Sequence, residues 1–249
     1  MNSEMDMPDM VVLCGGRGTR LGNLTDAMPK PLLPIGGAPF LLRLLSQWRR
    51  EGVGRFILAV HYLAEQFQDF VRQHAGRIGP VEVCVEPQPL GTGGALRFAA
   101  QRVETPCFLA ANGDSYVSQP LGPVYEAHRR HGNPFTLVAV RPEAVAGGAK
   151  QKGRLLTDSI GDLREFSTEP DVQDGWVNAG VYVMAREAPQ SWADGKFDLE
   201  SRILPDAARQ RVRVFKSDGN LVDIGLPECY ATFDRRLGPL ERLFEGLNR

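Results

Sequence analysis

Short apolar runs alternate with amphipathic helical patterns through the first half of this 249-residue sequence. The apolar runs, rich in Val, Leu and Phe, lie at 10–14, 56–60, 81–85 and 107–111. The helical patterns lie at 40–51, 64–74 and 92–103. Strands that alternate with helices build a parallel sheet, because each parallel connection has to cross the sheet and carries a helix over one of its faces. The sequence therefore predicts an α/β fold with a mostly parallel central sheet and helices on both faces.

The second half reads differently, with more strands and fewer helices. Further strand-like runs lie at 135–140, 153–157, 163–166 and 177–184. A turn-rich stretch around Gly147 and Gly148 interrupts them, and a helical stretch at 198–209 and an amphipathic segment at 227–247 follow. No repeat and no Pro- or Ser-rich linker divides the chain. We therefore predict one domain, 1–249, with a small strand-rich insertion over its ligand cleft.

Composition excludes several classes of partner. The 29 Lys and Arg residues balance 30 Asp and Glu residues, so the net charge of −1 offers no field for nucleic acid or an anionic membrane. The first nine residues are polar and acidic, unlike a signal peptide, and no apolar run approaches the ~18 residues of a membrane span. The four cysteines are widely spaced, without C-x-x-C, which favours reduced thiols. We expect a cytoplasmic protein.

A glycine-rich loop follows the first apolar run directly. Residues 13–21 read L-C-G-G-R-G-T-R-L. Gly15, Gly16 and Gly18 allow consecutive backbone N–H groups to turn toward one anion, and Arg20 adds a planar cation suited to phosphate. The chain has 27 glycines, about 11% against a usual ~7%, and such glycines allow a ligand to approach the backbone. The loop predicts a phosphate site at the carboxyl end of the first strand.

Two familiar phosphate loops do not fit this segment. A Rossmann dinucleotide fingerprint needs a glycine where Leu21 stands and an acid after the second strand, where the sequence has His61 and Tyr62. A Walker loop needs G-K-[ST], which is absent. The remaining interpretation is a triphosphate-binding loop of another type. Lys30, held between two prolines that restrict the backbone, supplies a cation some ten residues later, although a solvated loop lysine is the plainer interpretation.

Two acidic residues also follow apolar runs. Asp114 lies in A-N-G-D-S at 111–115, and Asp223 lies in L-V-D-I-G at 221–225. Carboxylates at strand ends are suitable ligands for Mg²⁺, which takes one or two carboxylates together with phosphate oxygens. Asp223 read alone is more typical of a helix N-cap.

A second glycine-rich motif, E-P-Q-P-L-G-T-G-G-A at 86–95, follows the third strand. Its small residues allow a flat base to lie against the backbone. The carboxylate of Glu86 offers two acceptors for the adjacent N1–H and N2–H donors of guanine, whereas the edge of uracil or thymine suits an amide better. This motif favours GTP, with a solvated strand-end glutamate as the alternative.

Together these motifs resemble the sugar-1-phosphate nucleotidyltransferases. G-G-x-G-T-R-L is followed by P-K-P-L-L-P at 29–34, and the resemblance continues through V-N-A-G-V-Y at 177–182, F-D-L-E at 197–200 and D-I-G-L-P-E at 223–228. The resemblance implies a Rossmann-like, glycosyltransferase-A-like fold with a nucleotide-binding half at about 8–134 and a sugar-phosphate-binding half at about 135–249. It also implies that GTP and a sugar 1-phosphate are the substrates, and that pyrophosphate is released.

Site residues follow from the same resemblance. Arg20 and Lys30 are expected to be catalytic, and Asp114 and Asp223 to bind Mg²⁺. The expected nucleotide-binding residues are Leu13, Gly15, Gly16, Gly18, Thr19, Glu86, Gly91 and Thr92. The expected sugar-phosphate-binding residues are Gly113, Asn178, Gly180 and Glu200. Asp198 either contacts the sugar or caps the following helix.

One position departs from the family pattern. Related enzymes carry a lysine before a proline upstream of the N-A-G segment, and this sequence has Glu169 before Pro170. The cation expected at the sugar phosphate is therefore missing from its usual place. The candidates to replace it are Arg141, Lys150, Lys152 and Arg164.

Within the family, the motifs are most similar to the D-glycero-α-D-manno-heptose 1-phosphate guanylyltransferases, which feed capsule or surface polysaccharide. Mannose 1-phosphate guanylyltransferases and N-acetylmuramate 1-phosphate uridylyltransferases share several of them. A non-catalytic nucleotide-sugar sensor is the alternative of another class, but it predicts loss of Arg20, Lys30, Asp114 or Asp223, and all four are present. The segment 227–247 suits either the core or an interface between copies, so a homo-oligomer stays open.

Overall fold

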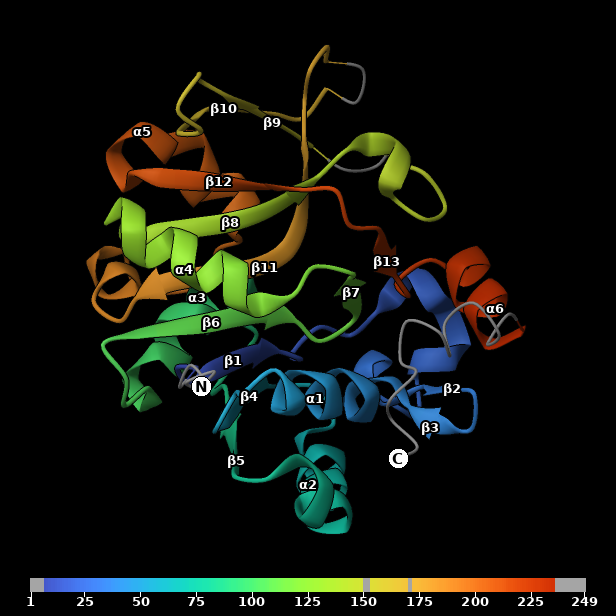
Figure 1. The fold of residues 1–249 in the computed structure, drawn as a ribbon. Coiled ribbons are helices and arrows are strands. Elements are labelled where there is room, and N and C mark those ends of the chain that lie inside the picture. The colour runs from blue at the N-terminus through green and yellow to red at the C-terminus, as the bar shows by residue number, and fades with distance from the viewer. Residues whose placement is uncertain (1–6, 150–152, 170–171, 236–249) are drawn as a thin grey trace, which may run out of the picture.

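A seven-stranded sheet runs through the molecule, with strand order β12-β8-β11-β6-β1-β4-β5 (Figure 1). The computed structural model describes residues 7–149, 153–169 and 172–235. The strands are β1 (Met10–Leu13), β4 (Phe56–Val60), β5 (Val81–Val85), β6 (Cys107–Asn112), β8 (Phe135–Val140), β11 (Val177–Ala185) and β12 (Val212–Ser217). Strand β11 is antiparallel to β6 and β8, and the other neighbouring pairs are parallel. The predicted mostly parallel sheet is confirmed.

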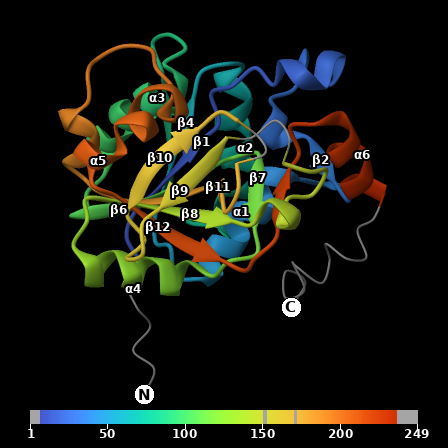
Figure 2. The same ribbon diagram turned by 90° about the horizontal axis from the view of Figure 1, so that it is seen from above.

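Helices cover both faces of this sheet (Figure 2). Successive residues of a strand point to opposite faces, so Val12 joins one core cluster and Val11 the other. The helices are α1 (Phe40–Arg50), α2 (Ala64–Ile78), α3 (Gly91–Ala99) and α4 (Leu121–His131). Buried residues of α1, α2 and α4 pack on the face of Val12, whereas α3 packs on the face of Val11. The predicted two-sided helical cover is also confirmed.

Three two-stranded antiparallel sheets accompany the large one. They pair β2 (Pro34–Ile35) with β3 (Ala38–Pro39), β7 (Ser115–Val117) with β13 (Leu221–Asp223), and β9 (Arg154–Thr157) with β10 (Leu163–Ser167). Of the four runs predicted after residue 134, only β9 and β10 form a separate pair. Strands β8 and β11 instead extend the central sheet, where most of their residues are buried. The edge strand β12 was not predicted, although V-R-V-F-K-S alternates as a strand should.

The last third of the chain is less regular than predicted. The helical stretch at 198–209 consists of a π-helical turn (Leu199–Ile203), a 3₁₀ turn (Leu204–Asp206) and the short α5 (Ala207–Gln210). Helix α6 (Pro227–Arg235) begins where the final amphipathic segment was expected, and 236–247 lies outside the described residues. In the described part of the chain, no helix has the length and apolar character needed to cross a membrane. All four cysteines are free thiols, as expected.

One histidine is buried between α4 and β8. Only 6% of His128 is exposed, and its Nδ1 lies 2.9 Å from the hydroxyl of Thr136 on β8. Burial disfavours the charged imidazolium and lowers the pKa of His128 from 6.5 to about 4. Protonation below pH 6.5 therefore occurs more readily in the unfolded chain than in the folded one.

The difference between the pKa of His128 in the folded and the unfolded chain predicts that the free energy of unfolding falls in acid. The stabilising contribution of neutral His128 is complete above pH 6.5 and is lost as the pH falls from 6.5 toward 4, by up to about 1.4 kcal/mol per pH unit. Urea unfolding at pH 7 and pH 5 measures this loss. In His128→Gln the loss between the two pH values should shrink, and in His131→Gln, at an exposed position of the same helix, it should match that of the wild type. Equal losses in all three proteins would contradict the assignment.

Candidate active site

The glycine-rich loop leaves β1 at the centre of the sheet. The Cys14 N–H donates to the Ala59 carbonyl on β4 (2.8 Å), and the Gly113 N–H donates to the Leu13 carbonyl (2.9 Å), so the base of the loop is tied to both neighbouring strands. Gly18 then adopts a left-handed conformation (φ 66°), which favours glycine, and turns the chain into the 3₁₀ segment Thr19–Thr25. A side chain at Gly16 would meet nothing within 4 Å. The loop therefore presents open backbone at the carboxyl edge of the sheet.

Four predicted residues converge around Gly225. Lys30, in the 3₁₀ turn Lys30–Leu32, is 7% exposed, and its Nζ forms an ion pair with Asp114. A Cβ atom placed on Gly225 would lie 2.9 Å from Lys30 Nζ, 3.2 Å from Arg20 Nη2 and 2.7 Å from Asp223 Oδ1. The structure thus brings the predicted catalytic cations and the predicted metal ligands together at one glycine.

Pairing of β7 with β13 is what joins the two acids. Asp223 lies opposite Ser115 in this pair, and the Ile224 N–H donates to the Asp114 carbonyl (3.1 Å). Asp223 Oδ1 accepts the Gly225 N–H at 2.7 Å. Asp223 therefore ends a strand and orders a tight turn, and its carboxylate stays at the cluster.

The donor set suits Mg²⁺ that arrives with a polyphosphate. Within the described residues no three His, Cys, Asp or Glu side chains are grouped closely enough to form a complete metal cage. Mg²⁺ does not need one, because it binds through one or two carboxylates together with phosphate oxygens and water. Asp114 and Asp223, both beside Lys30, are such a pair of carboxylates.

Glu86 lies under the glycine-rich loop. It is 4% exposed, and burial raises the pKa of its carboxyl, an effect that the hydrogen bond from the Leu90 N–H opposes. That N–H donates to Oε2 at 3.0 Å, while Oε1 would lie 2.7 Å from a Cβ atom on Gly15. The sequence argument assigned both oxygens to a guanine edge. In the structure one of them already accepts a bond from the protein, so Oε1 is the acceptor left beside the loop.

The glycines of the second motif contact protein. A side chain at Gly91 would meet the Phe197 carbonyl at 2.6 Å, and one at Gly93 would overlap the Phe197 ring. The N–H groups of Gly93 and Gly94 donate to the Phe197 carbonyl at 3.0 and 3.2 Å. These glycines allow the segment around Phe197 to pack on α3, and their predicted contact with a nucleotide stays a prediction.

Other predicted residues also have protein partners. The Thr92 N–H donates to the Asp198 carboxylate at 2.9 Å, so Asp198 caps α3 and not the turn that follows it. A side chain at Gly113 would meet Cys14 Sγ at 2.6 Å. This glycine, too, is required by packing within the protein.

Three of the four predicted sugar-phosphate-binding residues, Asn178, Gly180 and Glu200, form one hydrogen-bonded group. Asn178 Nδ2 donates to the Tyr182 hydroxyl (3.0 Å) and to Glu200 Oε1 (3.4 Å). Asn178 Oδ1 accepts the N–H of Gly180 (3.0 Å), whose φ of 71° accompanies a bulge in β11. Sequence reasoning missed Tyr182, although it lies four residues after Asn178 on the same strand. Burial and the nearby Glu200 carboxylate raise the pKa of Tyr182, so its hydroxyl stays protonated.

Of the four candidates for the missing cation, one has a distinctive environment. Arg141 lies over the ring of Trp176, 4.7 Å from its centroid. Arg164 forms an ion pair with Asp158 on the β9–β10 hairpin. The other two candidates, Lys150 and Lys152, lie outside the described residues, as does Pro170, which follows Glu169.

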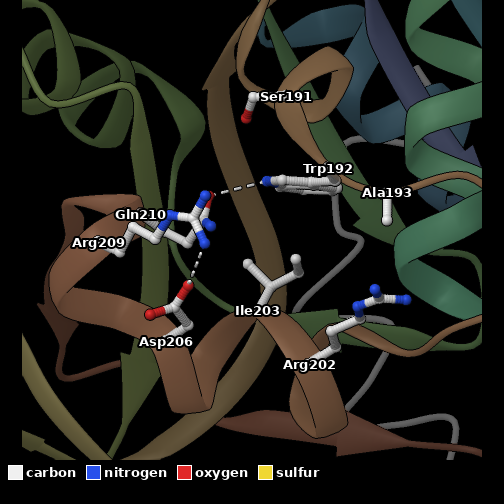
Figure 3. A pocket seen from close by; sticks show the side chains of 8 residues that line it. All are labelled: Ser191, Trp192, Ala193, Arg202, Ile203, Asp206, Arg209 and Gln210. Carbon is white, nitrogen blue, oxygen red and sulfur yellow. Dashed lines mark hydrogen bonds and ion pairs between the residues drawn. The ribbon is translucent and has the colours of Figure 1, made fainter.

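A separate cavity of about 280 Å³ lies beside α5 (Figure 3). The Trp192 indole N–H donates to Gln210 Oε1 at 3.0 Å, and Arg209 lies 3.8 Å from Asp206. The cavity is lined by Ser191, Trp192, Ala193, Arg202, Ile203, Asp206, Arg209 and Gln210. None of the predicted site residues lines it, so it is distinct from the cluster at Gly225.

The Nucleotidyl transferase family model matches residues 9–228. The chain belongs to this family. The predicted resemblance to sugar-1-phosphate nucleotidyltransferases is confirmed by this match and by guanylyltransferases among the relatives of the chain.

Individual relatives agree with this assignment. The chain is 31% identical over 89% of its length to the mannose-1-phosphate guanylyltransferase catalytic subunit beta of Drosophila pseudoobscura pseudoobscura, of which it spans 60%. It is 26% identical over 90% of its length to the D-glycero-alpha-D-manno-heptose 1-phosphate guanylyltransferase of Campylobacter jejuni, of which it spans 97%. The crystal structure of HddC from Yersinia pseudotuberculosis, 28% identical, superposes with a TM-score of 0.80 over 93% of this chain and all of that chain. A structure of HddC complexed with GMP-PN gives 0.79 over the same shares.

The packing of Gly93 predicts a stability effect. Gly93→Ala would press a methyl group into the Phe197 ring, and overpacking of this kind costs about 1–3 kcal/mol, more than the helical preference of alanine returns. Gly122→Ala on α4 is the matched control, because its methyl group would meet nothing within 4 Å. Thermal unfolding should show a lower Tm for Gly93→Ala and an unchanged or higher Tm for Gly122→Ala. A Gly93→Ala protein as stable as its control would show that Phe197 does not constrain this position.

Proposed function

We propose that this protein transfers GMP from GTP to a sugar 1-phosphate and releases pyrophosphate. The observation that carries the proposal is the convergence of Arg20, Lys30, Asp114 and Asp223 at Gly225, beside an open glycine-rich loop. Cations and carboxylates in this arrangement suit a metal-bound polyphosphate. The names of the relatives support guanylyl transfer and a sugar 1-phosphate as acceptor.

The chemistry needs positioning and charge neutralisation more than proton transfer. An oxygen of the sugar phosphate attacks the α-phosphorus of GTP in line, a new P–O bond forms, and the bond to the β-phosphate oxygen breaks. A phosphate monoester dianion attacks without a general base. Arg20, which is exposed, would bind the leaving phosphates, and buried Lys30 would neutralise charge at the α-phosphate. Mg²⁺ held by Asp114 and Asp223 would supply charge neutralisation on phosphate oxygens.

We propose D-glycero-α-D-manno-heptose 1-phosphate as the acceptor. Support comes from the Campylobacter jejuni relative, which matches this chain over 97% of its own length, and from the TM-score of 0.80 with HddC. The product, GDP-heptose, would feed capsule or surface polysaccharide, and we place the reaction in the cytoplasm. Mannose 1-phosphate is the second candidate, because the Drosophila relative that is 31% identical carries the name of a mannose-1-phosphate guanylyltransferase.

A substrate screen tests the proposal directly. Pyrophosphate release should be measured with GTP, ATP, UTP and dTTP against the 1-phosphates of heptose, mannose and glucose, with and without Mg²⁺. We expect release with GTP and heptose 1-phosphate, and its loss when EDTA removes the metal. Activity confined to UTP or dTTP would refute the guanine assignment of Glu86. Activity with mannose 1-phosphate alone would replace the proposed acceptor with the second candidate.

Arg20 offers a test of the proposed chemistry. Arg20→Ala should lower kcat by about 10²- to 10³-fold, because a cation that stabilises charge in the transition state contributes a few kcal/mol. Steady-state assays of pyrophosphate release measure the effect. Arg50→Ala, at an exposed position of α1, should keep wild-type rates. Wild-type turnover in Arg20→Ala would remove Arg20 from the mechanism.

A further inference from the structure

Two cations lie against one indole ring in the second half of the chain. The Arg141 guanidinium is 4.7 Å from the centroid of the Trp176 ring, and Lys216 Nζ is 5.3 Å from the same centroid. Arg141 follows β8 directly, and Lys216 lies on the edge strand β12. Attraction between a cation and the ring offsets part of the repulsion between the two like charges. Both positive charges therefore lie at the same ring.

These charges lack an acidic partner in the part of the chain that the structure describes. Other cations there do have one: Arg97 pairs with Asp194, Arg164 with Asp158, and Arg213 with Asp162. Within residues 7–149, 153–169 and 172–235, no carboxylate forms an ion pair with Arg141 or Lys216. Two neighbouring cations without a protein anion favour an anionic ligand.

The backbone and the ring of Trp176 both have partners in the protein. The backbone N–H of Trp176 donates to the Leu155 carbonyl at 3.0 Å, and the backbone N–H of Leu155 donates to the Trp176 carbonyl at 2.7 Å, which ties this residue to β9. The side chain of Trp176 packs against the core cluster that includes Leu155. A packed ring limits the freedom of the two long side chains that lie on it. The entropy lost when they bind a ligand is correspondingly smaller.

Strand register puts the pair beside the sugar-binding group. Lys216 lies opposite Ala139 in the pair of β12 with β8, and Asn178 lies opposite Ala139 in the pair of β8 with β11. Lys216 and Asn178 therefore occupy the same row of the sheet, with Cα atoms about 10 Å apart across two strand spacings. Their row is at the end of the sheet where β8 and β12 finish and β11 begins, as Figure 1 shows.

We propose that Arg141 and Lys216, presented by Trp176, bind the phosphate group of the sugar 1-phosphate, with Asn178 and Glu200 contacting the sugar. This inference rests on the proposed function for the identity of its ligand. A phosphate monoester carries close to two negative charges at neutral pH, which two cations match. Arg141 offers a planar pair of donors and Lys216 a point charge, so the phosphate would be both oriented and neutralised.

Kinetics of single variants test the assignment. Arg141→Ala and Lys216→Ala should each raise KM for the sugar 1-phosphate by about 10- to 100-fold, the usual effect of losing one charge-assisted hydrogen bond. KM for GTP should change less than about twofold, and Lys216→Arg should restore most of the loss. The matched control is Arg129→Ala, because Arg129 also lies over an aromatic ring, Tyr125 at 5.8 Å, but on α4. An unchanged KM for the sugar phosphate, or an equal rise for GTP, would overturn the proposal.

A binding measurement separates failure of this inference from failure of the proposed function. Trp176 is partly exposed, whereas Trp48 and Trp192 are buried, so a ligand at the pair should change the emission of Trp176. Titration with mannose 1-phosphate or inorganic phosphate, without nucleotide, should give a saturable change that Lys216→Ala weakens at least tenfold and Trp176→Phe removes. This result would support the anion site even if no sugar phosphate is turned over. No saturable change in the wild-type protein would overturn it.

Discussion

The buried ammonium group of Lys30 is the constraint on which the arrangement of the site depends. A charge with so little exposure requires an anionic partner, since an unpaired buried charge costs several kcal/mol. Asp114 supplies that partner, and the pairing of β7 with β13 brings Asp223 to the same place. Arg20 completes a cluster of two cations and two carboxylates. The charges of this cluster balance, so a bound Mg²⁺ would add the net positive charge that a triphosphate requires, while exposed Arg20 stays available to its phosphates.

The sheet explains why these segments meet. Strands β1 and β6 are neighbours and parallel, so the loops that follow them, with Arg20 and Asp114, emerge at one edge. The glycines then divide into two groups. Gly16 and Gly18 keep the phosphate loop open or sharply turned, whereas Gly91, Gly93 and Gly113 make room for Phe197 and Cys14. The glycine surplus thus reflects tight packing around the site as much as open backbone for a ligand.

Much of the fold and of the candidate site could be predicted, because both correspond to short patterns in the sequence. Apolar runs of strand length predicted most of the central sheet, and the motifs around Arg20, Lys30, Asp114 and Asp223 predicted the residues that the structure brings together at Gly225. The misses have physical reasons. Strand β12 is an edge strand whose apolar residues alternate with polar ones, so a search for continuous apolar runs did not find it. Tyr182 lies in an apolar strand, as core residues do, and only the fold brings the side chain of Asn178 to its hydroxyl.

The sequence by itself determined the α/β class and the family, because motifs and hydrophobic periodicity are local properties of the chain. Only the tertiary structure decided which residues lie together. Lys30 and Asp114 are 84 positions apart, and Arg141 and Lys216 are 75 apart, yet each pair meets at one place. Strand order and register bring them together, and these depend on contacts between distant segments that no local pattern encodes.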